Sequence, residues 1–90
     1  KKYVKKWFAP VKKSIDAGIP VLWSVELGLF PEQGGQQSSG GHMRLLVGYN
    51  EESGVVYFSD SWGAGHEKKA IKMNHAAAMT QARYILRPSR

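Results

Sequence analysis

The sequence feature that most constrains the fold is a pair of strand-like segments joined by a short polar turn. The first segment, residues 40–50, reads Gly-Gly-His-Met-Arg-Leu-Leu-Val-Gly-Tyr-Asn, and the second, residues 55–63, reads Val-Val-Tyr-Phe-Ser-Asp-Ser-Trp-Gly. Aliphatic and aromatic residues dominate both, and the connection Glu51–Gly54 is polar and ends in glycine. This pattern predicts an antiparallel β-hairpin.

The predicted hairpin brings a histidine and a carboxylate close together. With the turn centred after residue 52, partner residues have numbers that sum to about 105, which places Asp60 opposite Leu45 and His42 opposite Gly63. A neutral imidazole can take a proton from a nucleophile only if its ring is held, and a carboxylate on its other nitrogen does that. The hairpin therefore predicts two members of a catalytic triad.

A purely structural interpretation accounts for the same residues. A histidine that opens a strand after two glycines is often a surface residue. The segment Asp60-Ser61-Trp62-Gly63 is also typical of an Asx-type turn whose tryptophan packs in the core. Spacing alone favours this interpretation over a catalytic one.

The residues of the two segments also resemble those of a known protein family. Together they resemble the second half of papain-like cysteine peptidases, in which a histidine opens a strand that ends in Val-Gly-Tyr and the next strand ends in Asn-Ser-Trp-Gly. The likeness covers about residues 15–87 and is greatest to the bacterial branch related to double-glycine leader peptidases, whose orienting residue is Asp. The resemblance implies that His42 is the general base and Asp60 its orienting partner. It implies that Trp62 shields this pair from water and that Gly63 permits the turn that follows.

The chain contains no cysteine, although in this family the nucleophile is a cysteine at the start of a helix in a separate lobe. Ser61 directly follows the orienting residue, and Ser38 and Ser39 lie in a Gly/Gln-rich loop with no helix N-terminus to activate a hydroxyl. We therefore expect residues 1–90 to form a single domain that is the C-terminal part of a larger papain-like peptidase domain, inactive by itself. The alternative is a non-catalytic module of the same fold that binds a peptide or an anionic partner.

A long loop, residues 28–41, precedes the histidine strand. Its Gly/Gln-rich composition predicts an exposed segment, with Leu29 and Phe30 packed down, and a disordered connector is the simpler interpretation. The resemblance places the end of this loop on the rim of the cleft, where substrate is contacted. It assigns Gly40, Gly41 and Ser61 to that rim.

The formal net charge is +6, and six lysines fall within the first 13 residues. Apolar residues recur between them at helical spacing, which predicts one apolar stripe and one lysine face. Such a face is usually solvated surface, and binding to acidic polymers or anionic lipid is the alternative. Pro10 predicts a helix over residues 10–17 that follows a helical lead-in over 2–9, with Gly18 in the C′ position.

The remaining elements follow in order. We expect a strand over 21–27, an edge strand in the lysine-rich segment that ends at residue 73, a helix over 75–81 capped by Asn74, and a last strand over 82–87. The predicted class is α+β: a short N-terminal helix, then a curved antiparallel sheet or half-barrel, with a small helix before the last strand.

Neither a metal nor a cofactor is expected, because His42, His66 and His75 lack the spacing of metal ligands. The expected partner is a peptide or protein substrate, bound together with the cysteine-bearing lobe. An apolar wall left open by that lobe predicts a weak homodimer of this chain. Nucleic acid is not expected as a partner, and no apolar run is long enough to span a membrane.

Overall fold

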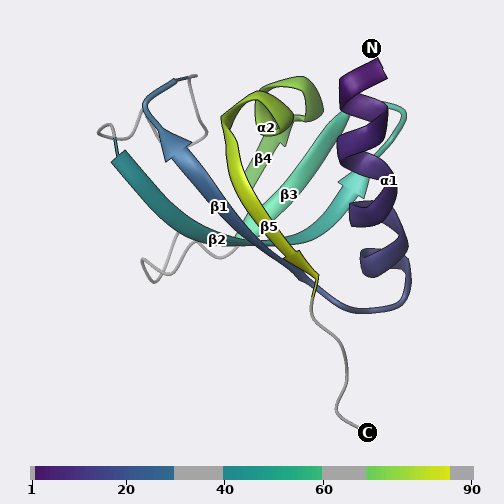
Figure 1. Ribbon diagram of the computed structural model, residues 1–90. Helices are drawn as coiled ribbons and strands as arrows, with labels where there is room; N and C mark the ends of the chain where they lie inside the picture. Colours follow the sequence, from purple (N-terminus) through teal and green to yellow (C-terminus); the bar gives the residue numbers. More distant parts are fainter. Residues whose placement is uncertain (1, 30–39, 60–68, 86–90) are drawn as a thin grey trace, which may run out of the picture.

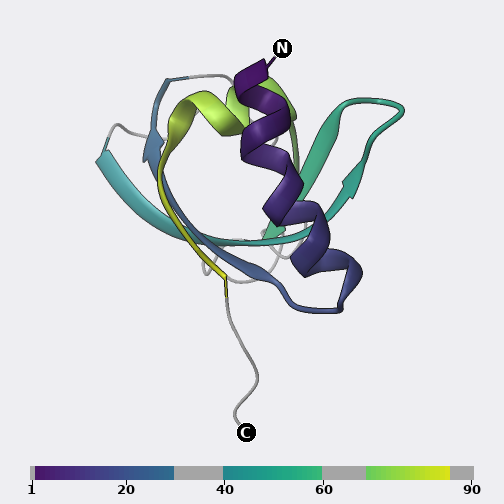
Figure 2. The same cartoon turned by 45° about the vertical axis from the view of Figure 1, so that its right-hand side comes forward.

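Five strands form one antiparallel sheet in the computed structural model, which describes residues 2–29, 40–59 and 69–85. The order along the chain is α1 (Lys2–Asp16), β1 (Val21–Leu27), β2 (Gly40–Asn50), β3 (Val55–Ser59), β4 (Lys69–Lys72), α2 (Met73–Met79) and β5 (Thr80–Ile85). The strand order within the sheet is β4-β3-β2-β1-β5. The sheet is strongly curved, and both helices lie on its concave side (Figures 1 and 2). This arrangement confirms the predicted α+β class and the edge position of β4.

The core lies between the concave face of the sheet and the two helices. Alternate residues of β1 are buried, and Trp23 at its centre has no exposed surface. Trp7 of α1 meets Trp23 edge to face, with ring centroids 6.3 Å apart, and Phe58 of β3 also meets Trp23 edge to face at 5.7 Å. The strand over residues 21–27 was predicted with the bounds that the structure shows.

Helix α1 is continuous from Lys2 to Asp16, with Pro10 inside it. The prediction of a separate lead-in before a helix that begins at Pro10 is therefore wrong. A proline inside a helix costs about 3 kcal/mol. Trp7 and Phe8 before it and Val11 after it are all buried in the same core, and each such burial stabilises by about 1.5–3 kcal/mol. Tertiary packing thus outweighs the local break.

Helix α1 ends at Asp16, one residue before the predicted end, and Gly18 occupies the predicted C′ position. Gly18 has a φ of 80°, in the left-handed region that glycine adopts without a side-chain penalty. Its N–H donates to the carbonyl of Ile15, and the N–H of Ile19 donates to the carbonyl of Ser14, both at 2.9 Å. These two bonds form a Schellman motif, which turns the chain into β1.

Two further predictions need correction. Helix α2 begins at Met73 and not after Asn74, and its N-cap position, Lys72, makes no side-chain capping bond. The helix is fixed instead by the burial of Met73 and Met79, and β5 consequently begins at Thr80. Leu29 is 52% exposed, so it does not pack down as expected.

Candidate functional site

His42 lies on the concave face of the sheet, the side that the helices cover. It is half-buried and stands directly opposite Val25 of β1. Residues that are directly opposite in an antiparallel pair share a face. Val25 is fully buried, and so is Trp23, the partner of Arg44. The side chain of His42 therefore points to the concave side, near the first residue of β2, Gly40.

A β-bulge in β2 changes the register of the hairpin. Near the turn, Gly48 lies opposite Tyr57 and Asn50 opposite Val55, which is the predicted register. Between Leu46 and Gly48 the register shifts, so Leu46 lies opposite Phe58 and Leu45 opposite Ser59. The prediction that Leu45 lies opposite Asp60 is therefore wrong. The sequence-based register assumed a regular ladder, and the extra residue Val47 breaks it.

The shift decides which residues of β3 share the face of His42. A slip of one residue moves every side chain of a strand to the other face. Phe58, opposite Leu46, is fully buried on the concave side, whereas Ser59, opposite Leu45, belongs to the outer side. Because alternate residues of β2 share a face, His42, Arg44 and Leu46 lie on the same side as Phe58.

Two buried cations occupy this face, and neither was predicted from the sequence. Arg44 is 1% exposed, and its guanidinium carbon lies 4.3 Å from the centroid of the Phe58 ring and 6.0 Å from that of Trp23. Lys69, on β4, is 3% exposed and stands directly opposite Phe58. The signal in the sequence was the two-residue spacing from His42 to Arg44, which places both on one face of a strand.

The outer side of the sheet next to Gly41 carries a small polar cluster. The side-chain amide of Gln81 donates to Glu26 at 2.8 Å, and the hydroxyl of Ser24 donates to the side-chain oxygen of Gln81 at 3.2 Å. A side chain added at Gly41 would come within 3.5 Å of that same oxygen. The predicted rim residue Gly41 is thus bordered by polar groups on the face opposite to His42.

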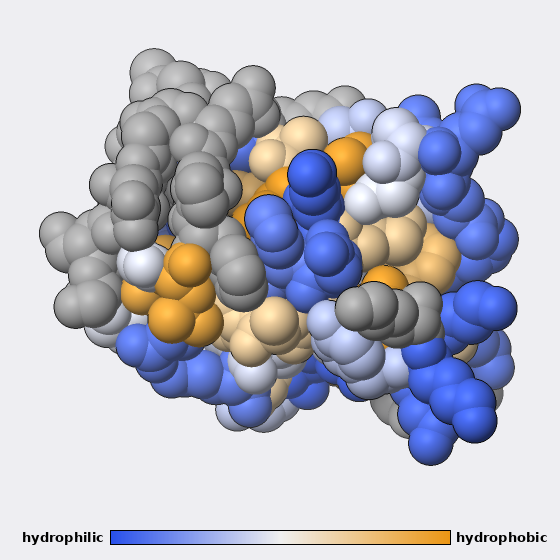
Figure 3. Space-filling view, turned by 90° about the horizontal axis from the view of Figure 1, so that it is seen from above, coloured by the Kyte–Doolittle hydropathy of each residue, from blue (hydrophilic) through white to orange (hydrophobic). Residues whose placement is uncertain are grey.

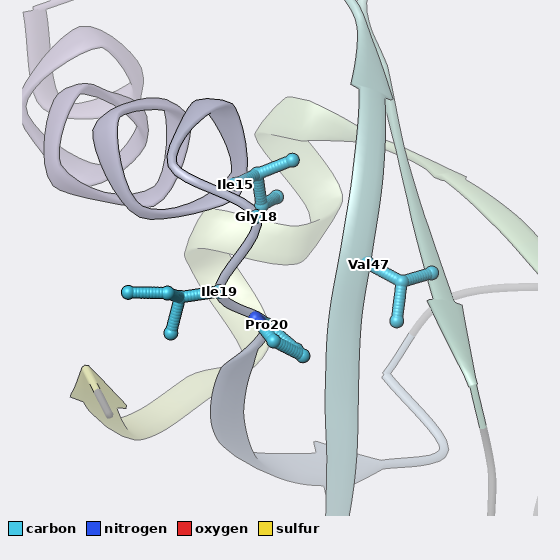
Figure 4. Close-up of a pocket in the computed structure, with 5 residues that line it drawn as sticks. All are labelled: Ile15, Gly18, Ile19, Pro20 and Val47. Atoms are coloured by element: carbon cyan, nitrogen blue, oxygen red, sulfur yellow. The ribbon is translucent and has the colours of Figure 1, made fainter. Parts of the chain in front are cut away.

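A small hollow of about 120 Å³ lies at the other end of β2. It is lined by Ile15, Gly18, Ile19, Pro20 and Val47, which come from the end of α1, the turn after it and β2 (Figure 4). At about 3.3 Å per residue along a strand, Val47 is roughly 16 Å from His42. The hollow is therefore well separated from His42 along β2.

Several predicted site residues lie outside the described part of the chain. They are Asp60, Ser61, Trp62 and Gly63. Within residues 2–29, 40–59 and 69–85, no group of three or more His, Cys, Asp or Glu side chains is placed to hold a metal ion. No helix in those same ranges has the length and apolar character needed to cross a bilayer.

The resolved pKa shifts belong to groups away from His42. The pKa of Tyr49 is raised, chiefly because its hydroxyl donates a hydrogen bond to Asp16. The pKa of Lys12 is raised, chiefly by its bond to Glu51. Burial lowers the pKa of Arg83, whose guanidinium donates to the backbone carbonyl of Trp7.

Comparison with known protein families shows the family to which the chain belongs. The family model described as the Peptidase_C39 like family matches residues 1–87. The chain belongs to this family. Neither a curated protein nor a solved structure matches the chain. Membership of the Peptidase_C39 like family supports a relationship to C39-type peptidases and a peptidase-related fold.

Proposed function

We propose that this chain is the His/Asp-bearing lobe of a papain-like cysteine peptidase, close to the double-glycine leader peptidase branch, and the C-terminal part of a larger catalytic domain. In this proposal His42 is the general base and Asp60 holds its ring. The observation that carries it is the β-bulge at Val47, which sets the face of β3 that looks toward His42.

Side chains alternate between the two faces of the sheet along β3. Val56 and Phe58 are buried on the concave side, and Ser59 is directed to the outer side. Asp60 follows Ser59 in the sequence, so continued alternation would bring its carboxylate to the concave side, opposite Arg44 and diagonal to His42. In the regular register it would be opposite Leu45, on the other face from His42. The bulge thus supports the proposed pair.

The proposed chemistry is acyl transfer to a cysteine of the other lobe. The imidazole of His42 takes the proton from the cysteine thiol, and the thiolate attacks the carbonyl carbon of the scissile peptide bond. The imidazolium then gives that proton to the leaving amine, and water hydrolyses the thioester. Asp60 accepts a hydrogen bond from the other ring nitrogen throughout. Trp62 and Gly63 complete the support of this pair, with Gly40, Gly41 and Ser61 on the substrate rim.

The test uses the longest natural chain that contains these 90 residues. We expect it to cleave a peptide with a Gly-Gly site in a thiol-dependent reaction that an alkylating agent blocks. His42→Ala should lower the rate by several orders of magnitude, because loss of one triad member removes most of the catalysis. His75→Ala, which removes a second half-buried histidine on α2, is the matched control and should leave the rate unchanged.

The 90-residue chain alone should cleave nothing, because it has no cysteine. Cleavage that survives His42→Ala would contradict the proposal. Peptide binding by the long chain without any cleavage would instead support a non-catalytic peptide-binding module.

A further inference from the structure

We propose that the outer face of α1 docks reversibly on an anionic lipid surface. Four exposed lysines form this face, which we call the lysine stripe: Lys2, Lys5, Lys6 and Lys13. Their spacing places them on one side of the helix, opposite the buried Trp7 and Val11. Seen from above, hydrophilic side chains gather at the edge of the molecule on the α1 side (Figure 3). Lys2 and Lys13 are about 16 Å apart along the axis at 1.5 Å per residue.

Three of the four stripe lysines oppose the helix dipole of α1, whereas Lys13, in the last turn, agrees with it. Lys2, Lys5 and Lys6 lie in its N-terminal half, where the helix dipole is positive, and no acidic residue lies in the first turn. Asp16 stands at the C-terminus, where a cation is favoured. Lys2 also has like-charged neighbours three and four positions on, an arrangement that destabilises a helix. Helix stability therefore does not account for Lys2, Lys5 and Lys6.

The stripe also lacks compensation from the rest of the described molecule. Within residues 2–29, 40–59 and 69–85, the ion pair of α1 is the 2.6 Å contact of Lys12 with Glu51, and the four stripe lysines form none. An anionic partner would relieve their mutual repulsion at the place where it is greatest.

The composition of the stripe favours lipid over other anionic partners. All basic residues of α1 are lysines, whereas arginine makes the bidentate contacts that nucleic-acid recognition uses. Lysine is also depleted in the cores of protein interfaces. Ala9 at the centre of the stripe is small and exposed, so a flat surface can reach all four lysines. Clusters of four or more lysines on a helix are typical of binding to anionic headgroups.

The burial of the apolar side of α1 determines the kind of binding. Trp7, Phe8 and Val11 are held in the core, so they do not insert into a bilayer. Binding then rests on charge alone, and salt should weaken it. The domain would lie on the surface without penetrating it, and would detach readily.

The test is co-sedimentation of the purified chain with vesicles at low salt. We expect binding to vesicles of phosphatidylcholine with one-third phosphatidylglycerol and none to pure phosphatidylcholine. Lys13→Gln should weaken binding about fivefold. Lys72→Gln makes the same change in net charge at an exposed position on β4, off the stripe, and should bind like the wild type. The quadruple Lys→Gln variant of the stripe should lose binding by about a hundredfold or more.

Unfolding cannot explain that loss if the quadruple variant keeps its circular dichroism and its melting temperature, which we expect because repulsion is removed. Equal binding by Lys13→Gln and Lys72→Gln, or by the quadruple variant and the wild type, would overturn the proposal. Binding to heparin or duplex DNA without binding to the anionic vesicles would overturn it too, in favour of a soluble polyanion. His42→Ala should bind vesicles like the wild type, so failure of the peptidase proposal leaves this result unaffected.

Discussion

The indole N–H of Trp23 donates a 2.6 Å hydrogen bond to the hydroxyl of Thr80. The indole of Trp7 donates to the same oxygen at 2.9 Å, and the hydroxyl donates to the carbonyl of Ala76 at 2.6 Å. One side chain at the start of β5 therefore serves both buried tryptophans and connects α1, β1 and α2.

Thr80→Val keeps the shape of this side chain and removes its oxygen. Each buried donor left without an acceptor costs about 1–3 kcal/mol, so we expect the free energy of unfolding to fall by about 2–4 kcal/mol in urea titrations. Thr80→Ser keeps the hydroxyl and should lose less than half as much. Equal losses in the two variants would show that the methyl group, and not the hydrogen bonds, stabilises this point.

Gly48→Ala tests the close approach of Tyr57 on β3 to Gly48 on β2. A Cβ at Gly48 would lie 3.3 Å from Cδ2 of Tyr57, so the aromatic ring or the strand must move, and we expect a loss of about 1–2 kcal/mol in unfolding free energy. Gly41→Ala is the control on the same strand, because its Cβ would meet the flexible end of Gln81 at 3.5 Å. A Gly48→Ala variant as stable as Gly41→Ala would contradict the close approach of Tyr57.

The hydrogen bond from Tyr49 to Asp16 predicts a pH dependence. It raises the pKa of Tyr49, so the contribution of this pair to stability is complete below the unfolded tyrosine value of about 10 and disappears as pH rises through the folded value. Asp16→Ala should lower the pKa of Tyr49 in an NMR titration of its ring protons. Glu52→Gln removes a carboxylate three positions along the chain that does not contribute to the raised pKa of Tyr49, so it should leave that pKa unchanged. A Tyr49 pKa unchanged by Asp16→Ala would exclude the bond.

Elements defined by local chemistry were predictable from the sequence. The strand Val21–Leu27 follows Pro20, precedes Gly28 and consists mainly of strand-forming residues, and its bounds were correct. The turn over Glu51–Gly54 was also predicted correctly. It is held by local bonds to Asn50: the side-chain oxygen of Asn50 accepts from the N–H of Ser53, and the backbone carbonyl of Asn50 accepts from the N–H of Gly54. Gly18 was placed correctly, since only its left-handed conformation closes α1.

Features that depend on packing between distant segments were not predictable. Pro10 breaks a helix locally, yet Trp7 and Phe8 are held by a core whose other half comes from the sheet. The start of α2 depends in the same way on burial of Met73. The shift at Val47 depends on which residues of β2 and β3 can be buried together, which a count from the turn does not include.

The nuclear Overhauser effects of residue 60 test directly whether Asp60 pairs with His42. We predict cross-strand backbone contacts from Asp60 to Arg44, which continue the register seen at Leu45 and Ser59, together with contacts from the Asp60 side chain to the ring of His42. Backbone contacts from Asp60 to Leu45, with none to the His42 ring, would place the carboxylate on the opposite face of the sheet and contradict the proposed catalytic pair.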